Sequence, residues 1–273
     1  MIISKSELQR LANREKVALG TLEKDYVLTE VLKSLSQVST LSELLVFKGG
    51  TALRKVYFAD WRYSEDLDFT VKRDMKKVEL RQELDKWYRQ VEQASQVRLA
   101  TKMLHKPDGY ARVRAQFIGP LSYPGMIFMD LSFDEPLCLA PDRRKVLAAP
   151  FSSEGQRLLV YPLEELLAEK MRSLVERGKS RDYYDVWRLL KEQHVNLDFK
   201  LLVTVLKQKL THKGLAIRNL GDFFPKDRDD GLKRYWEKDL GQQIRLLPPL
   251  VEALAELRAM LDKLIAPHFQ SLD

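Results

Sequence analysis

One stretch of the sequence, residues 44–71, constrains the fold more than any other. It begins with a short apolar run, passes through Gly49-Gly50 into helical spacing of apolar residues, and ends in a run that alternates apolar and polar side chains. Residues at alternate positions of a strand share one face, so Asp66 and Asp68 project side by side. The order strand, glycine turn, helix, strand predicts that this part of the chain forms an α/β sheet.

The remaining segments fall into two groups along the chain. Apolar residues at three- and four-residue steps predict helices over 5–38 (two helices that separate at Gly20-Thr21), 51–58, 75–93, 162–177, 180–193, 199–210, 232–240 and 249–265. Strand-like runs over 96–103, 110–117 and 126–133, separated by turn residues, predict an antiparallel meander. We therefore predict an α+β fold: a mixed sheet with flanking helices over residues 1–155, then a helical bundle over 156–273.

Composition excludes several classes of protein. The 273 residues are 45% hydrophobic and 31% charged, with 12 Gly and 11 Pro, which excludes collagenous, low-complexity and wholly disordered chains. A single cysteine, Cys138, excludes a disulfide framework and a thiolate-rich zinc site. The 46 basic and 39 acidic side chains leave a net charge of +7, which favours a polyanionic partner such as nucleic acid or nucleotide.

The first twenty residues have no apolar block typical of a signal peptide. They carry Lys5, Arg10, Arg14 and Lys16 among their apolar side chains. The longest apolar runs elsewhere have about the length of a strand and are too short to cross a membrane. We therefore expect a cytoplasmic protein with no membrane partner.

The pair Gly49-Gly50 is a candidate phosphate-binding turn. Consecutive glycines before a helix let the backbone approach a ligand closely, and the free amides of the helix start favour a phosphate. The sequence here is neither a P-loop nor a dinucleotide-binding fingerprint. A plain strand-to-helix turn is the alternative interpretation.

Asp66 and Asp68 are candidate ligands of a divalent cation. Two neighbouring carboxylates on one strand face repel each other unless a cation lies between them, and Mg²⁺ prefers such oxygens together with substrate phosphates. Two harmless aspartates on a solvated strand face are the alternative. The nearby glycine turn favours the metal, because metal-assisted phosphoryl transfer needs a phosphate site beside the carboxylates.

These motifs resemble those of a known family. Residues 47–54 (FKGGTALR) and 62–69 (RYSEDLDF) resemble the signature of the DNA polymerase β-type nucleotidyltransferase fold. More narrowly, they resemble the AbiEii/AbiGii toxins of type IV toxin–antitoxin and phage-abortive systems, which include the MenT-type toxins. Residues 164–172 (EELLAEKMR) and 181–185 (RDYYD) are similar to later motifs of that family, in the same order.

The resemblance implies roles for individual residues of the first domain. Asp66 and Asp68 are implied to hold Mg²⁺ and to be catalytic, and Asp130, on a later strand, is the candidate for a third carboxylate that binds the metal. A bond from Asp130 to a neighbouring turn is the alternative for that residue. The candidate nucleotide-binding residues lie in or beside the two quoted motifs: Gly49, Gly50, Thr51, Arg54 and Ser64.

The second motif block contributes Lys170, Asp182 and Asp185 as candidate catalytic residues. The resemblance implies that Lys170 contacts the transferring phosphates, and that one of the two aspartates belongs to the site. The sequence does not decide which aspartate it is. Asp182 and Asp185 share a helix face, toward which Arg181 is a candidate partner. The alternative for Lys170 is a surface ion pair with a glutamate of its own helix.

Basic and aromatic residues on the later strands are candidates for contact with an RNA backbone or a splayed base, although a solvated sheet face or a packed core explains them equally well. They are Lys102, Lys106, Arg112, Arg114, Arg143, Arg144, Lys145, Tyr110 and Tyr123.

Together these features predict a Mg²⁺-dependent nucleotidyltransferase toxin that binds a nucleoside triphosphate in a cleft between its two domains. The resemblance implies an RNA acceptor, most plausibly the 3′ end of tRNA, and a cognate antitoxin encoded alongside. Transfer to a protein or to a small molecule such as an aminoglycoside is the alternative within the same chemistry. A non-catalytic GTP- or RNA-binding module is the alternative from another class.

Overall fold

The computed structural model describes residues 2–151 and 156–269. Within them the chain forms two compact units. The first runs to Leu137 and includes Pro141–Tyr161; the second comprises Cys138–Ala140 and the chain from Pro162 onward. The predicted boundary after residue 155 falls at the edge of 152–155, which lie outside the described residues.

The helices of the first unit are α1 (Lys5–Glu15), α2 (Leu19–Leu35), α3 (Ser39–Leu44), α4 (Gly49–Ala52) and α5 (Lys77–Ser95). A π-helical turn, Leu53–Tyr57, continues α4. The predicted break at Gly20-Thr21 is wrong. The chain leaves α1 at Lys16, whose left-handed backbone (φ +57°) ends the helix, and Gly20 lies inside the first turn of α2.

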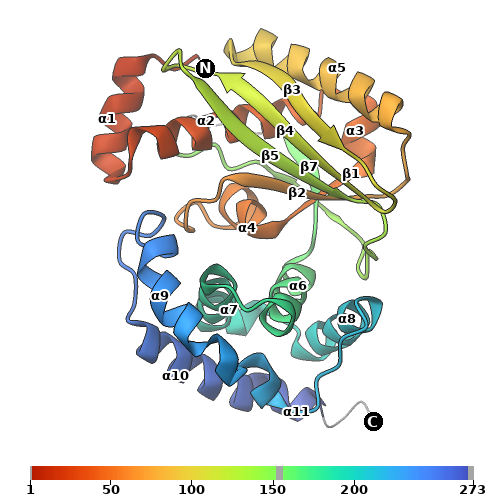
Figure 1. Ribbon diagram of the computed structural model, residues 1–273, viewed down its shortest axis with the longest axis vertical. Coiled ribbons are helices and arrows are strands. Elements are labelled where there is room, and N and C mark those ends of the chain that lie inside the picture. Colours follow the sequence, from red (N-terminus) through yellow and green to blue (C-terminus); the bar gives the residue numbers. More distant parts are fainter. Residues whose placement is uncertain (1, 152–155, 270–273) are drawn as a thin grey trace. The chain divides into compact units, whose positions relative to one another are not determined.

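A seven-stranded mixed sheet forms the centre of the first unit (Figure 1). Its strands are β1 (Leu45–Lys48), β2 (Asp66–Val71), β3 (Arg98–His105), β4 (Tyr110–Ile118), β5 (Pro124–Ser132), β6 (Asp142–Lys145) and β7 (Arg157–Val160), in the order β3-β4-β5-β2-β1-β7-β6. The predicted antiparallel meander is confirmed as β3-β4-β5, and β2 pairs with β5 in parallel. Strands β6 and β7 were not predicted; β7 joins the first unit because it pairs with β1.

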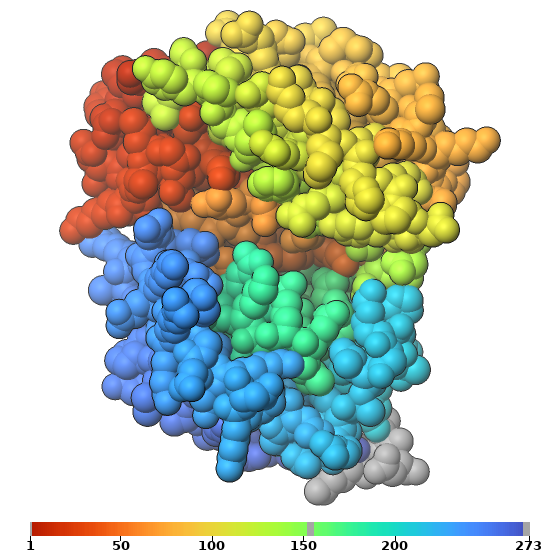
Figure 2. Space-filling model, viewed as in Figure 1, coloured from red at the N-terminus to blue at the C-terminus, as the bar shows by residue number. Residues whose placement is uncertain are grey.

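The two faces of this sheet differ in chemistry. The face bearing Leu67 and Phe69 packs against helices: the rings of Phe69 and Trp87 of α5 are 6.2 Å apart, and the Trp87 indole donates to the Val31 carbonyl of α2 at 2.9 Å. Burying each such side chain stabilises the fold by roughly 1.5–3 kcal/mol. The polar face carries the alternate residues, including Asp66. At the sheet edge, side chains of β3 lie on the surface of the unit (Figure 2, yellow).

The second unit is helical, as predicted. Its helices are α6 (Leu163–Glu176), α7 (Ser180–Gln193), α8 (Phe199–His212), α9 (Asp229–Leu240), α10 (Leu250–Met260) and α11 (Ala266–Phe269), and a π-helical turn, Leu261–Ile265, joins the last two. Short 3₁₀ turns lie at His194–Asn196, Leu220–Phe223 and Lys226–Arg228. No helix in the described ranges combines the length and apolar character needed to cross a membrane.

Candidate active site

The glycine turn lies directly against Asp68. Lys48, the last residue of β1, is paired with Asp68 of β2, and Gly49 follows with φ +79°, a conformation that favours glycine. A Cβ on Gly49 would lie 2.2 Å from Oδ2 of Asp68, closer than any real contact. Only glycine therefore lets the turn and this carboxylate occupy their positions.

The next residues of the turn contact the other predicted nucleotide-binding positions. A Cβ on Gly50 would lie 3.3 Å from Oγ of Ser64 and 2.7 Å from a guanidinium nitrogen of Arg62. Thr51 donates its hydroxyl to the Asp66 carbonyl at 2.5 Å. The structure thus brings Gly50, Thr51 and Ser64 together where β1 and β2 approach each other.

Asp130 lies beside Asp68 on the same face of the sheet. The parallel register of β2 and β5 pairs these two residues, whereas Asp66 is paired with Phe128. Asp130 accepts a hydrogen bond from the hydroxyl of Tyr110 and lies 3.6 Å from Nε of Arg112, both on β4. Burial, and then the hydrogen bond and charge of Asp130, raise the pKa of Tyr110. Asp130 therefore bonds to its strand neighbours rather than to a turn.

The carboxylates of this face offer the donors that Mg²⁺ prefers. Asp66 and Asp68 supply hard oxygen ligands from one strand face, which fits a divalent cation that takes its remaining ligands from water and substrate phosphate. In the part of the chain that the structure describes, no three His, Cys, Asp or Glu side chains converge as a ready-made metal cluster. The donor set thus fits a cation bound by two carboxylates and completed by substrate, rather than an all-protein cage.

Arg54 lies behind the turn in a buried network. Its guanidinium donates to Asp25 of α2 at 3.1 Å and to the Trp61 carbonyl at 2.5 Å, and it stacks on the ring of Tyr63 at 3.7 Å. Lys55, 1% exposed, donates to the other oxygen of Asp25 at 2.7 Å. Burial lowers the pKa of Lys55 to about 8, against the opposing charge of Asp25. The network fixes α4 and its π-helical turn to α2.

In the second unit, Lys170 of α6 contacts both predicted aspartates of α7. Its Nζ lies 2.9 Å from Asp185 and 3.6 Å from Asp182, and both carboxylates are fully buried. The surface ion pair weighed for Lys170 is therefore wrong, and so is the predicted partner Arg181. Arg177 instead holds Asp182 through two hydrogen bonds of 2.9 and 3.0 Å. Burial raises the pKa of Asp182, but Lys170 and Arg177 together lower it below its ordinary value.

Two comparisons with known proteins gave a match. The family profile described as nucleotidyl transferase AbiEii toxin, type IV TA system, matches residues 30–266. This chain belongs to the AbiEii family. A solved structure, the MenT4 nucleotidyltransferase toxin Rv2826c from Mycobacterium tuberculosis H37Rv, is 20% identical with a TM-score of 0.72, covering 98% of this chain and 92% of that one. That likeness shows a shared fold. The comparison with curated proteins gave no match.

Membership of the AbiEii family makes this chain a nucleotidyltransferase toxin and confirms the resemblance of its motifs. The matched residues include both motif blocks and most of the helical unit.

Most of the basic residues considered for RNA contact in this AbiEii chain are already paired with acids. Lys106 lies 2.9 Å from Asp74, and Arg112 faces Asp130. The other pairs are Arg143 with Glu43 at 2.7 Å and Arg144 with Asp142 at 2.9 Å. Lys102, Arg114 and Lys145 are exposed, as is Tyr123 at 73%.

Three residues near the AbiEii motifs were missed by sequence reasoning. Lys48 is paired with Asp68 and lies over the ring of Tyr161 at 5.6 Å, and Arg62 packs on the glycine turn. Both residues lie inside the quoted motifs, so their positive charge within a candidate nucleotide-binding motif could have marked them in the sequence. Arg177 follows the end of α6, and no local sequence pattern predicts its bond to Asp182, because that bond depends on the turn between two helices.

Proposed function

We propose that this chain transfers a nucleotide from a nucleoside triphosphate to the 3′ end of a tRNA, in a Mg²⁺-dependent reaction that blocks translation. The observation that carries the proposal is the contact of the Gly49 turn with Asp68, because it joins a phosphate-binding turn to a carboxylate pair. Nucleotidyl transfer requires these two functions side by side.

Each part of this arrangement has a task in the proposal. Asp66 and Asp68 would hold Mg²⁺, which when bound would supply positive charge to the triphosphate and to the acceptor hydroxyl. The backbone amides of Gly49, Gly50 and Thr51 bind the phosphates, since glycine lets the backbone approach them closely. Ser64 donates its hydroxyl to the same phosphates from beside Gly50.

Asp130 and Arg54 are assigned supporting tasks. Asp130 places a third negative charge beside Asp68, and Tyr110 keeps that carboxylate oriented by its hydrogen bond. Arg54 is 6% exposed and engaged by Asp25, so we assign it to positioning the turn rather than to touching the nucleotide.

Lys170 supplies a point charge to the transferring phosphates. Asp182 and Asp185 hold its ammonium from two sides, and both are positioning residues in this proposal. The two carboxylates balance the charges of Lys170 and Arg177, so the cluster is neutral without a nucleotide.

The family implies two partners, a nucleoside triphosphate and a type IV antitoxin. We propose that the antitoxin is encoded beside this chain and that the toxin acts in the cytoplasm, where tRNA is found. The excess of basic residues, +7 overall, supports an RNA acceptor over an uncharged one.

The test is incubation of the purified protein with Mg²⁺, total tRNA and each α-labelled nucleoside triphosphate in turn. We expect label on tRNA with the wild type, and no label with Asp68→Ala or when EDTA removes the metal. Lys200→Ala, which removes an exposed charge of α8 outside both motif blocks, is the matched control and keeps the activity.

Other outcomes of this experiment decide between the alternatives. Label on protein or on an aminoglycoside, with tRNA unlabelled, would reject the RNA acceptor and keep nucleotidyl transfer. If Asp68→Ala still arrests growth in cells and no labelled product forms in the assay, the proposed enzymatic activity would be rejected in favour of a binding module.

A further inference from the structure

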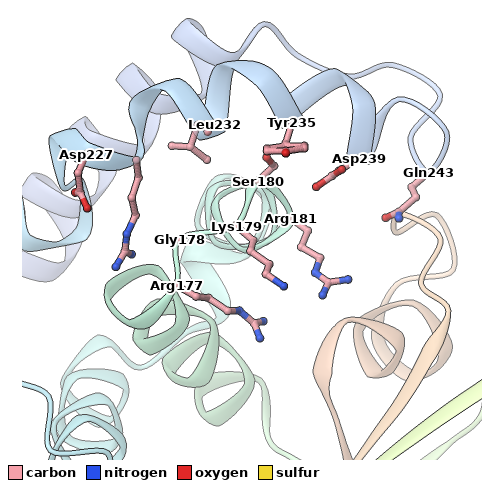
Figure 3. Close-up of a pocket in the computed structure, with 12 residues that line it drawn as sticks. Arg177, Gly178, Lys179, Ser180, Arg181, Asp227, Leu232, Tyr235, Asp239 and Gln243 are labelled. Carbon is pink, nitrogen blue, oxygen red and sulfur yellow. The ribbon is translucent and has the colours of Figure 1, made fainter. Parts of the chain in front are cut away.

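The second unit contains a pocket that the proposed chemistry does not use. Its volume is about 700 Å³, and it lies between the turn that joins α6 to α7 and the helix α9 (Figure 3). It adjoins the Lys170 cluster, because Arg177 both lines the pocket and holds Asp182. A ligand in the pocket would therefore lie against the second motif block.

One wall of the pocket is cationic. The turn contributes Arg177, Lys179 and Arg181, whose charged ends gather on one side in Figure 3. Arg177 is engaged by Asp182, whereas Lys179 and Arg181 form no ion pair with any residue that the structure describes. Two cations without an ion pair, at positions 179 and 181, suit the phosphodiesters of a nucleic acid strand, each of which carries one negative charge.

The hydroxyl of Ser180, between these cations in the sequence, also has no hydrogen-bond partner among the described residues. Ser180 lines the pocket and is 2% exposed, and its side chain makes no hydrogen bond to a described residue. Because Ser180 lines the pocket and its hydroxyl has no described partner, that hydroxyl is available to a ligand in the pocket. Ser180 begins α7, where backbone amides also favour an anion.

The opposite wall differs in chemistry. It presents Tyr235 of α9, 39% exposed, together with the carboxylates of Asp227 and Asp239. An aromatic ring offers a stacking surface to a base, and carboxylates accept hydrogen bonds from base amines or ribose hydroxyls while repelling phosphates. Apart from Arg228, whose guanidinium is already bonded to backbone carbonyls of α6, the cations lie on one wall and the ring and carboxylates on the other. This arrangement suits the phosphate and the base of a nucleotide residue within a strand.

We propose that this pocket binds the acceptor RNA: Lys179, Ser180 and Arg181 contact consecutive phosphodiesters, and Tyr235 stacks on a base. The inference rests on the proposed transfer to RNA and deepens it, since it assigns the acceptor strand to a specific surface of the helical unit. It also separates the two substrates, because the triphosphate is assigned to the glycine turn and carboxylates of the first unit.

The test measures RNA binding and nucleotide use separately in the full-length protein. Filter binding of labelled total tRNA at several salt concentrations gives the affinity and its salt slope. We expect Arg181→Ala to weaken binding about tenfold and to reduce the slope of log affinity against log salt by about 0.7, the value for one phosphate on a single strand. In the transfer assay, KM for tRNA rises while KM for the triphosphate is unchanged.

Matched variants test the two walls. Lys200→Ala removes an exposed charge of the same unit outside the pocket, so tRNA binding stays within twofold of wild type. Tyr235→Phe keeps the ring and retains binding, whereas Tyr235→Ala loses about fivefold or more. Circular dichroism checks that each variant is folded.

Three results would overturn the inference. The first is a loss of tRNA binding with Lys200→Ala equal to that with Arg181→Ala. The second is a change with Arg181→Ala that is confined to KM for the triphosphate. The third is unchanged tRNA binding with Arg181→Ala while Asp68→Ala still abolishes transfer. The last result leaves the proposed function intact. Conversely, loss of tRNA binding with Arg181→Ala in a protein that labels no RNA would reject the function and leave an RNA-binding pocket.

Discussion

At the scale of single residues, Gly49 determines whether the candidate active site can form. Its φ of +79° and the contact with Asp68 both exclude a side chain. We expect Gly49→Ala to lower the free energy of unfolding by about 1–2 kcal/mol through the left-handed conformation, with a further loss from the displaced carboxylate. Transfer activity falls to background. Urea unfolding and the labelling assay measure the two effects.

Gly214 provides the matched control for this prediction. It also has a positive φ, +63°, but a Cβ there would meet nothing within 4 Å. Gly214→Ala therefore carries the backbone strain alone and leaves transfer unchanged. If both variants retained full activity, the assignment of the Gly49 turn to the active site would be wrong.

Lys55 predicts a pH dependence of stability. Its pKa is about 8 in the folded protein, below the ordinary value of about 10.4, because burial disfavours the charged form. Between these values the unfolded state binds more protons, so the free energy of unfolding rises with pH by at most about 1.4 kcal/mol per unit. Urea unfolding at pH 7.5 and pH 9.5 should show this rise in the wild type and not in Lys55→Met; equal pH dependence in both proteins would contradict it.

At the scale of elements, the sequence predicted those whose pattern is local. Strand β2 and helices α6 to α8 were predicted because alternation and helical periods are complete within each segment. Strands β6 and β7 were missed, since each has only four residues. Strand β7 is defined by pairing with the distant β1, and β6 by pairing with β7. The contact of Asp130 with Tyr110 likewise depends on the register of β4 and β5, which no local pattern specifies.

Helix α6 also holds a segment from a distant part of the chain. The fully buried Glu165 accepts hydrogen bonds from the amides of Cys138 at 3.0 Å and Leu139 at 2.9 Å, and pairs with the equally buried Lys209 of α8 at 2.9 Å. Breaking a buried pair leaves an uncompensated charge. We expect Glu165→Gln to lower the free energy of unfolding by about 3–5 kcal/mol.

A double-mutant cycle in urea unfolding measures this pair. Lys209→Met removes the ammonium that Glu165→Gln leaves buried without its carboxylate, so the double variant should be more stable than Glu165→Gln alone. Additive losses in the two single variants would show that the pair is not coupled.

At the scale of the whole molecule, the proposed reaction uses a motif block from each unit. The first unit contributes Asp68 and the second Lys170, both assigned to one reaction. Groups that act in one step give non-additive losses. We expect Asp68→Ala and Lys170→Ala each to abolish transfer, and the double variant to be no worse than either. Single-turnover rates test this, and retention of most activity in Lys170→Ala would contradict the assignment of the second block.

The site as a whole was only partly predictable from sequence. Both motif blocks were found in the sequence, because their charged residues follow one another in the same order as in the family that they resemble. Their partners were not: Arg177 replaces the expected Arg181, and Arg54 lies in a buried network with Asp25. Such contacts join segments that are distant in sequence or separated by a turn, so they follow from tertiary packing rather than from spacing.

The measurement that tests the central claim most directly is mass spectrometry of tRNA after incubation with the protein, Mg²⁺ and nucleoside triphosphates. We expect the 3′-terminal fragment to gain the mass of one or more nucleotide residues with the wild type. We expect no gain with Asp68→Asn, which keeps the shape of the side chain and removes its charge. An unchanged 3′ fragment with active wild-type toxin, or an equal gain with Asp68→Asn, would contradict it.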